Sequence, residues 1–347
     1  MKARSMPLAM TQMRKEIEEI PQAVERLLSE GQAAVTAAAT AIRAQDPLLL
    51  LSAARGSSDH ACTYLKYASE ILLGLPMASV GPSVASIYKA PLQQRRALAL
   101  SVSQSGQSPD ILELTRSFAA SGSFTVAITN DPFSPLAQAA HHTLDIHAGP
   151  ERSVAATKTF VTSLVAGLWL MAELTQDRQI LVALRSLPAQ LETAATCDWS
   201  EAIAALTGGS LFTLGRGPSS AISNEAALKF KETCQIHAES YSSAEVLHGP
   251  VSIVEQHFPV IAFAAADAAE QTVCEVADQL ARKGAQVFVT SSRVSAATPL
   301  PHQRTGHWIT DPIAAIVSFY AMVEQVAVQR GINPDAPRHL KKVTETV

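Results

Sequence analysis

Short apolar runs that each lead into a helical pattern are the feature that most restricts what this chain can fold into. The first run, at residues 48–52, carries four leucines in succession and is followed by a helical pattern over residues 59–73. A strand that is apolar on both faces is typical of a parallel sheet covered by helices on each side. The alternation continues with strands expected at residues 97–102, 124–129 and 142–146 and helices expected at residues 109–120 and 156–174.

The second half of the chain repeats this plan. The turn after its first strand reads Arg-Gly-Pro-Ser at residues 216–219, about 160 residues after Arg-Gly-Ser-Ser at residues 55–58. Strands are expected at residues 211–214, 260–264, 286–290 and 307–309, and helices at residues 221–234, 269–283 and 312–330. The pattern predicts an α/β protein made of two tandem, doubly wound domains, each with a parallel sheet and helices on both faces.

The length of 347 residues is sufficient for about two domains of ~150 residues each. We expect four parts, namely an N-terminal helical segment at 1–45, a first domain at 46–190, a second domain at 196–330 and a C-terminal tail at 331–347. The connection between the domains is expected within residues 185–204, which contain Pro188. Pro334 and Pro337 predict that the tail does not begin as a helix, and we expect it to close the active site.

Composition excludes several classes of function. A net charge of -4 argues against a broad face for the phosphate backbone, so no nucleic-acid partner is expected. The first ten residues lead into no apolar stretch, and the apolar helical pattern at 161–174 is shorter than the ~20 residues that a membrane span needs. No histidine or cysteine spacing indicates a metal, and no phosphate loop of a nucleotide triphosphate site is present. We therefore expect a cytoplasmic protein without a membrane anchor, metal or cofactor.

Serine-rich turns follow two of the expected strands, at residues 56–58 and 101–109. Ligands of parallel sheets bind at the carboxyl ends of strands, beside the N-termini of helices. Pro109 suits the first turn of the helix that follows the second serine-rich turn. An N-cap explains one serine, but the 101–109 turn holds more than one cap requires. Hydroxyls, backbone N–H groups and the helix dipole predict a site for one phosphate group.

Acid–base residues are expected on the helix that follows residue 220. Glu225, Lys229 and Glu232 fall at i, i+4 and i+7 and share one face. They form either an exposed ion pair or a partly desolvated carboxylate whose pKa is raised toward that of a general base. His248 in a loop and Lys342 in the tail are further candidates, although both residue types are often simply solvated. A phosphate site with these groups suits proton transfer on a phosphorylated sugar.

Four segments of the chain resemble the SIS (sugar isomerase) family, and more closely the isomerase half of glucosamine-6-phosphate synthase. They are Ser-Gln-Ser-Gly-Gln-Ser at 103–108, Glu-Arg-Ser-Val-Ala-Ala-Thr-Lys at 151–158, the segment from Asn224 through Glu239 to His-Gly-Pro at 248–250, and Pro-Arg-His-Leu-Lys-Lys at 337–342. The likeness covers nearly the whole chain. It implies tandem flavodoxin-like SIS domains and a sugar phosphate as the substrate.

The resemblance also implies roles for individual residues. The sugar phosphate would be held by Ser58, Ser103, Gln104, Ser105 and Ser108. Glu232 would be the base that moves a proton between C1 and C2, while Glu225 and Lys229 would line the same site. Glu151 would contact the sugar.

Two further roles concern the edge of the site. His248 would open the sugar ring and is supplied in this family by the neighbouring subunit, which implies a homodimer. Lys342 matches the lysine that forms a Schiff base with the ketose, although Lys341 beside it leaves that assignment open.

The chain also departs from the resemblance. It begins Met-Lys-Ala, where the synthase carries a glutaminase domain with an N-terminal cysteine, so no ammonia source is expected. Gln107 stands where the family usually has an acidic residue. We therefore predict a glucosamine-6-phosphate deaminase that yields fructose 6-phosphate and ammonia. A fructosamine-6-phosphate deglycase, a plain aldose–ketose isomerase and a non-catalytic phosphosugar sensor remain alternatives, and gluco and galacto substrates are not distinguished.

Overall fold

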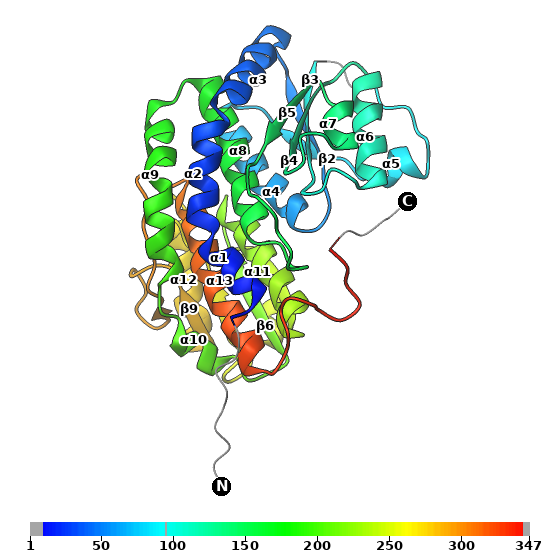
Figure 1. Ribbon diagram of the computed structural model, residues 1–347. Coiled ribbons are helices and arrows are strands. Elements are labelled where there is room, and N and C mark those ends of the chain that lie inside the picture. Colours follow the sequence, from blue (N-terminus) through cyan, green and yellow to red (C-terminus); the bar gives the residue numbers. More distant parts are fainter. Residues whose placement is uncertain (1–9, 94–95, 343–347) are drawn as a thin grey trace.

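The computed structural model describes residues 10–93 and 96–342, and it contains two parallel five-stranded sheets. The strand orders are β2-β1-β3-β4-β5 and β10-β9-β8-β6-β7, so each sheet reverses its winding direction once, beside its first strand. Figure 1 shows the first sheet at the upper right and the second below it, with helices between and around them. The predicted α/β fold class of two doubly wound parallel sheets is confirmed.

The first sheet is buried on both faces, as its apolar strands predict. Its strands are β1 (Leu49–Ala53), β2 (Met77–Ser79), β3 (Ala97–Val102), β4 (Phe124–Thr129) and β5 (His142–Asp145). Alternate residues point to opposite sides, so Leu50 packs in the core with α4 (Ser57–Leu72) and α8 (Lys158–Thr175). Leu51 packs on the other face, beneath α5 (Ser83–Ser86), α6 (Pro109–Ala120) and α7 (Pro135–Ala139).

The second sheet differs from expectation at its two edges. Its strands are β6 (Ser210–Gly215), β7 (His237–Ser242), β8 (Pro259–Ala262), β9 (Gln286–Val289) and β10 (Thr298–Pro299). The expected strand at 307–309 is wrong: these residues form a turn in which the His307 carbonyl accepts from the Thr310 amide. The edge strand β7 was not anticipated, because its sequence is mostly polar. It lies at the edge of the sheet and pairs with β6, so its residues need not be apolar on both faces.

Helices join the two sheets into one continuous core. One apolar cluster contains residues of α4 and α8 together with α11 (Ser219–Cys234) and α13 (Asp311–Gln329). Further helices extend this layer, and α12 covers the outer face of the second sheet. Their bounds are α1 (Gln12–Glu18), α2 (Ile20–Glu30), α3 (Gln32–Gln45), α9 (Arg178–Ala195), α10 (Ser200–Ala205) and α12 (Glu270–Arg282). Two 3-10 turns, η1 (Glu245–Leu247) and η2 (Pro250–Ile253), follow β7.

The expected connection at residues 185–204 is largely helical, because α9 continues to Ala195 and α10 begins at Ser200. Pro188 lies inside α9 rather than ending it. A proline in a helix interior costs about 3 kcal/mol or more, but Leu184, Leu187 and Leu191 on the same helix are fully buried. Burial of this apolar face offsets the hydrogen bond that Pro188 cannot donate.

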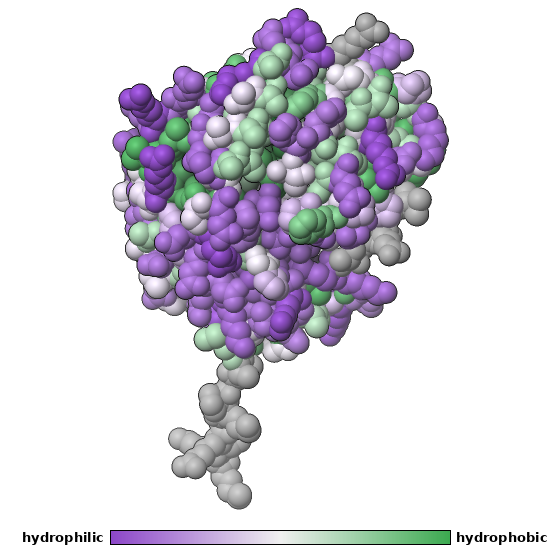
Figure 2. Space-filling view, turned by 45° about the horizontal axis from the view of Figure 1, so that its top comes forward, coloured by the Kyte–Doolittle hydropathy of each residue, from purple (hydrophilic) through white to green (hydrophobic). Residues whose placement is uncertain are grey.

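By length and composition alone, the helix α13 could cross a membrane. However, 89% of its apolar 18-residue stretch is buried inside the molecule. It is therefore explained as a core helix. On the face drawn in Figure 2, hydrophilic residues predominate, with apolar residues in separate small groups among them. From the lower end of α13 the tail runs up towards the first sheet (Figure 1), without helix in its described part.

Candidate active site

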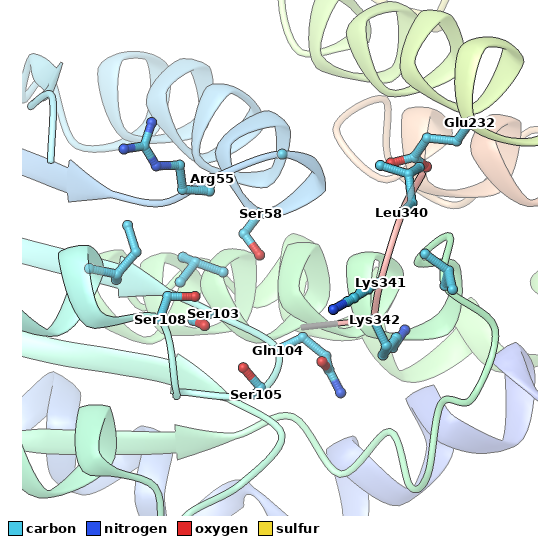
Figure 3. A pocket seen from close by; sticks show the side chains of 14 residues that line it. Arg55, Ser58, Ser103, Gln104, Ser105, Ser108, Glu232, Leu340, Lys341 and Lys342 are labelled. Atoms are coloured by element: carbon cyan, nitrogen blue, oxygen red, sulfur yellow. The ribbon is translucent and has the colours of Figure 1, made fainter. Parts of the chain in front are cut away.

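A cavity of about 300 Å³ lies where the first sheet, α11 and the C-terminal tail meet. Loops at the carboxyl ends of β1 and β3 form one side of it, at the point where the strand order reverses. Figure 3 shows serines from these loops on one side, with Glu232 and the tail lysines on the other. The lining residues are Arg55, Gly56, Ser58, Val102, Ser103, Gln104, Ser105, Ser108, Ile111, Val154, Glu232, Leu340, Lys341 and Lys342.

The serine-rich turn between β3 and α6 is held by its own side chains. The Ser103 hydroxyl accepts from the Gly106 amide at 3.2 Å, and the Ser105 hydroxyl accepts from the Gln107 amide at 3.2 Å. Gly106 has φ +61°, and a Cβ there would lie 2.1 Å from the Ser134 hydroxyl. A side chain at this position would therefore push the turn away from its packing against Ser134.

Two serine hydroxyls remain open to a ligand. Within the described part of the chain, the Ser58 and Ser108 hydroxyls have no hydrogen-bond partner. Ser108 is the N-cap residue of α6, and Ser58 lies in the first turn of α4. Both helices direct their N-termini at the cavity, which favours an anion there. The structure thus brings all five predicted phosphate-binding residues, Ser58, Ser103, Gln104, Ser105 and Ser108, to one cavity.

Arg55 also lines the cavity. In the sequence, this residue stood out only because its turn, Arg-Gly-Ser-Ser, resembles a turn in the second half of the chain. Its guanidinium lies 2.7 Å from the carboxylate of Asp110, which is fully buried at the start of α6. The positive charge of Arg55 is therefore already balanced by a buried acid.

Glu225 and Lys229 form a buried ion pair behind the cavity, with 3.2 Å between the Lys229 amine and the Glu225 carboxylate. Both side chains are fully buried, so the exposed-pair interpretation is wrong. Neither lines the cavity. Glu225 also interacts with His60 at 2.9 Å and accepts hydrogen bonds from Ser57 at 3.0 Å and Tyr320 at 3.1 Å. This network, the Glu225 cluster, joins α4 of the first sheet to α11 and α13 of the second.

The pKa of Glu225 is lowered, not raised as one of the two possibilities for a carboxylate on this helix would have it. Burial alone raises it, but the Lys229 ammonium, His60 and the Ser57 hydrogen bond outweigh burial and bring the pKa below its ordinary value. Burial lowers the pKa of Lys229, and the charges of Glu225 and Glu232 reverse this, so that it lies above its ordinary value. Glu225 and Lys229 are thus a fixed, fully ionised pair at neutral pH.

Glu232 is the residue of this helix face that reaches the cavity. Lys229 donates to its Oε2 at 2.5 Å, and the Glu232 side chain is 20% exposed. Its Oε1 has no hydrogen-bond partner among the described residues. One oxygen is therefore held in place and the other is open to accept a proton from a ligand.

The two tail lysines have different surroundings. The Lys342 amine donates to Glu151 at 2.7 Å, and Glu151 also accepts from the Thr157 and Thr159 amides and the Thr159 hydroxyl. Burial raises the pKa of Glu151, but Lys342 and these hydrogen bonds bring it below its ordinary value. Glu151 itself does not line the cavity. Its predicted contact with the sugar remains a prediction.

His248 is exposed, at the end of η1, and it is not among the residues that line the cavity. Glu232 lines the cavity and His248 does not, and the predicted role of His248 in a neighbouring subunit's site stays a prediction. Sequence reasoning missed His60 and Tyr320 in the Glu225 cluster. His60 lies one turn after Ser57 and offered a weak signal, whereas Tyr320 in an apolar helix offered none. In the described ranges, no group of three or more His, Cys, Asp or Glu side chains gathers as a metal site requires.

The second sheet has a corresponding point of reversal, between β6 and β8, with different chemistry. The turn after β8 carries alanines at residues 264–266 and then Asp267, in place of serines. Arg216 and Trp308 line a separate cavity there with Asp267. Burial raises the pKa of Asp267. An acidic residue and methyl groups do not form a phosphate site, so the two halves of the chain are not equivalent.

The SIS domain model matches residues 43–173 and 208–329, which together make up more than half of the chain. The chain belongs to the SIS domain family. Glutamine–fructose-6-phosphate aminotransferase (isomerizing) from Aeropyrum pernix is 34% identical over 353 residues, covering 95% of this chain and 56% of that protein. The counterpart from Sulfolobus acidocaldarius is 32% identical over 83% of this chain and 48% of its own length. This SIS chain thus spans about half the length of these relatives.

Solved SIS structures agree with the fold. A Silicibacter pomeroyi protein provisionally named a phosphosugar isomerase is 61% identical, covers 94% of this chain and all of its own, and superposes with a TM-score of 0.91. The C-terminal domain of glucosamine-fructose-6-phosphate aminotransferase from Francisella tularensis is 25% identical over 96% of this chain and all of its own, with a TM-score of 0.84. The glucosamine-6-phosphate deaminase of Thermotoga maritima, at 20% identity over 97% of this chain and all of its own, shares the fold with a TM-score of 0.78.

Proposed function

We propose that this SIS protein is an enzyme of the phosphosugar isomerase type that converts glucosamine 6-phosphate into fructose 6-phosphate and ammonia. One observation carries the proposal: a single cavity holds the serine turns of the first sheet, Glu232 of α11 and the tail lysines. A phosphate on C6 and the carbons C1 and C2 lie at opposite ends of an open-chain hexose. The cavity offers anion donors at one end and a proton acceptor at the other.

The reaction would begin with ring opening by His248 of a neighbouring subunit, which moves a proton from O1 to O5 of the sugar. The open Oε1 of Glu232 then takes the proton from C2 and returns it to C1. A second proton passes from the amine nitrogen to O1, so C1 becomes a hydroxymethyl carbon and the amine becomes an imine at C2. Holding the substrate by its phosphate fixes C1 and C2 at this oxygen, which lowers the entropic part of the barrier.

Lys342 would complete the reaction. Its amine, once released from Glu151 and deprotonated, attacks C2 of the imine and displaces ammonia, leaving a Schiff base between Lys342 and the sugar. Water then adds to C2, and cleavage of the C2–N bond returns the lysine and yields fructose 6-phosphate. The 2.7 Å contact with Glu151 supports this assignment, because it holds the lysine at the wall of the site.

The proposal includes a cytoplasmic homodimer. The exposed position of His248 outside its own chain's cavity supports donation of this residue to a second subunit. The burial of α13 within the molecule supports a location outside the membrane.

Ammonia release from the purified protein tests the proposal. Glucosamine 6-phosphate, galactosamine 6-phosphate and a fructosamine 6-phosphate are supplied separately, with the Glu232→Gln variant as the control. Formation of ammonia and fructose 6-phosphate in equal amounts, abolished in the variant, is the expected result. Tight binding of glucosamine 6-phosphate without any turnover would contradict a deaminase.

A plain aldose–ketose isomerase is the second candidate. The relative at 61% identity carries the name of a phosphosugar isomerase, and such a reaction needs Glu232 but no release of ammonia. Interconversion of fructose 6-phosphate and glucose 6-phosphate in the same assay, with no ammonia from any amino sugar, would favour this candidate. Solvent deuterium incorporation at C1 or C2 would report the proton transfer that both reactions share.

A further inference from the structure

Of the described positively charged side chains that line the cavity, two are paired with carboxylates and one is not. Arg55 pairs with Asp110 at 2.7 Å, and Lys342 pairs with Glu151 at 2.7 Å. Within the described residues, Lys341 lines the same cavity and has neither a hydrogen bond nor an ion pair. Among the described cations that line the cavity, Lys341 is therefore the one whose charge is not already paired, and its side chain is exposed.

The two neighbouring lysines point in different directions. In the view of Figure 3, the Lys341 side chain extends towards the side where Ser103, Ser105 and Ser108 lie, whereas the Lys342 amine turns away from them. The tail has no helix here, so consecutive side chains can diverge. One lysine thus faces the serine turn while the next is held by Glu151 on the cavity wall.

A sugar phosphate brings close to two negative charges at neutral pH. The serine hydroxyls and backbone amides supply neutral donors, and the helix N-termini supply only partial charge. We infer that Lys341 is the cationic ligand of the substrate phosphate and selects phosphorylated over neutral sugars. The inference rests on the proposed function of this cavity and adds a residue to it.

This assignment also gives the tail a mechanical role. Adjacent Cα atoms are about 3.8 Å apart, so a phosphate bound by Lys341 restricts the backbone beside Lys342. Glu151 already holds the Lys342 amine, so a bound phosphate would add to that placement, and an unphosphorylated sugar would not. A phosphorylated sugar is therefore expected to have both a higher kcat and a higher affinity than the same sugar without phosphate.

Calorimetric titration with fructose 6-phosphate and with inorganic phosphate tests the inference without requiring turnover. Lys341→Ala is expected to weaken the binding of both ligands by about tenfold to a hundredfold, as for the loss of a charge-assisted hydrogen bond. Lys341→Arg is expected to restore most of the affinity. The affinity of Lys341→Ala is also expected to depend less steeply on salt. Lys341 has no hydrogen bond or ion pair with the described residues, so the variant is expected to remain folded.

Lys283→Ala is the matched control, since it removes the same charge from an exposed residue that does not line the cavity. Equal affinities for Lys341→Ala and the wild type, or an equal loss in Lys283→Ala, would overturn the inference even if the protein releases ammonia. A specific loss in Lys341→Ala from a protein that releases no ammonia would retain the phosphate ligand and reject the deaminase.

Discussion

The Lys342 amine lies 2.7 Å from the Glu151 carboxylate, which ties the tail of the chain to a fully buried acid beside α8. The amides of Thr157 and Thr159 complete the surroundings of this carboxylate. Glu151 is thereby kept ionised, with its pKa below the ordinary value. The proposed nucleophile is thus placed by an ion pair rather than by packing of its own side chain.

Glu151→Gln is expected to reduce kcat by about tenfold to a hundredfold, because Lys342 loses the charge that positions it. A loss of about 1–3 kcal/mol in the free energy of unfolding is expected, since buried donors lose their ionised acceptor. Thr159→Val serves as the control, because it removes one hydroxyl and keeps the ion pair. An unchanged kcat in Glu151→Gln, measured by ammonia release, would show that Lys342 needs no such placement.

Glu225→Gln and Glu232→Gln, made on the same helix, are expected to have opposite profiles. Glu225 is fully buried against Lys229, so its loss is expected to cost about 3–5 kcal/mol of stability in urea unfolding. Glu232 is partly exposed and leaves Lys229 paired with Glu225, so its loss is expected to cost about 1 kcal/mol or less. Glu232→Gln is nevertheless expected to lower kcat by about 10²-fold or more. Equal destabilisation by both variants would contradict the division between cluster and cavity.

The stability of the protein is expected to fall on the acid side. The pKa of Glu225 is below its ordinary 4.5, so its stabilising charge is present above that value and is lost as the pH falls through the folded-state pKa. The pKa of Lys229 is above its ordinary 10.5, so its contribution persists below that value and is lost at higher pH. Urea midpoints are therefore expected to be flat between about pH 6 and 9 and to fall below about pH 4.5.

In Glu225→Gln, the urea midpoint is expected to fall less steeply with decreasing pH than in the wild type. Glu151 and Asp278 also have lowered pKa values, so a weaker decline is expected to remain in the variant. An identical slope in the wild type and in Glu225→Gln would argue against the ionised pair.

Ser108→Ala and Gly106→Ala separate the ligand contacts of the serine turn from its shape. The Ser108 hydroxyl has no partner within the described chain, so its removal is expected to raise KM about tenfold without changing stability. Gly106→Ala forces a Cβ to within 2.1 Å of the Ser134 hydroxyl and is expected to weaken phosphate binding and lower the melting temperature together. Steady-state kinetics and thermal unfolding on the same samples distinguish these outcomes.

Complementation tests the shared site. His248→Ala and Glu232→Gln homodimers are each expected to be inactive. After subunit exchange at equal amounts, half of the dimers are mixed and each has one intact site, so about a quarter of the wild-type activity is expected. No recovery, with exchange verified by differently tagged subunits, would place the role of His248 within its own chain or remove it.

Local patterns predicted the parts of the fold that depend on local residues. The strand β3 and the helix α6 appear at the expected residues because apolar runs and Pro109 mark them in the sequence. The strand β7 was missed because its polar residues pair on one side only. Pro188, which lies within the expected connection, is instead accommodated inside α9, whose leucine face is buried.

In the candidate site too, groupings of residues close in sequence could be predicted, and contacts between distant residues could not. Residues of the serine turn lie next to one another in sequence, so their convergence could be predicted. The contact between Ser57 and Glu225 spans 168 positions, and no pattern in a single sequence reports it. The sequence left open an exposed pair or a partly desolvated carboxylate on this helix. It could not show the three donors and the lysine around Glu225, which together lower its pKa.

The alanines at 264–266 and Asp267, in place of a second serine turn, determine how many substrate molecules one chain can hold. Each half has the same strand order, yet among the described residues the serine turns of the proposed phosphate site belong to the first half, and Glu232 belongs to the second. In the proposed reaction, the first half would therefore recognise the phosphate and the second would transfer the proton. Titration with sugar phosphate is expected to saturate at one molecule per chain, and neither half is expected to turn over substrate alone.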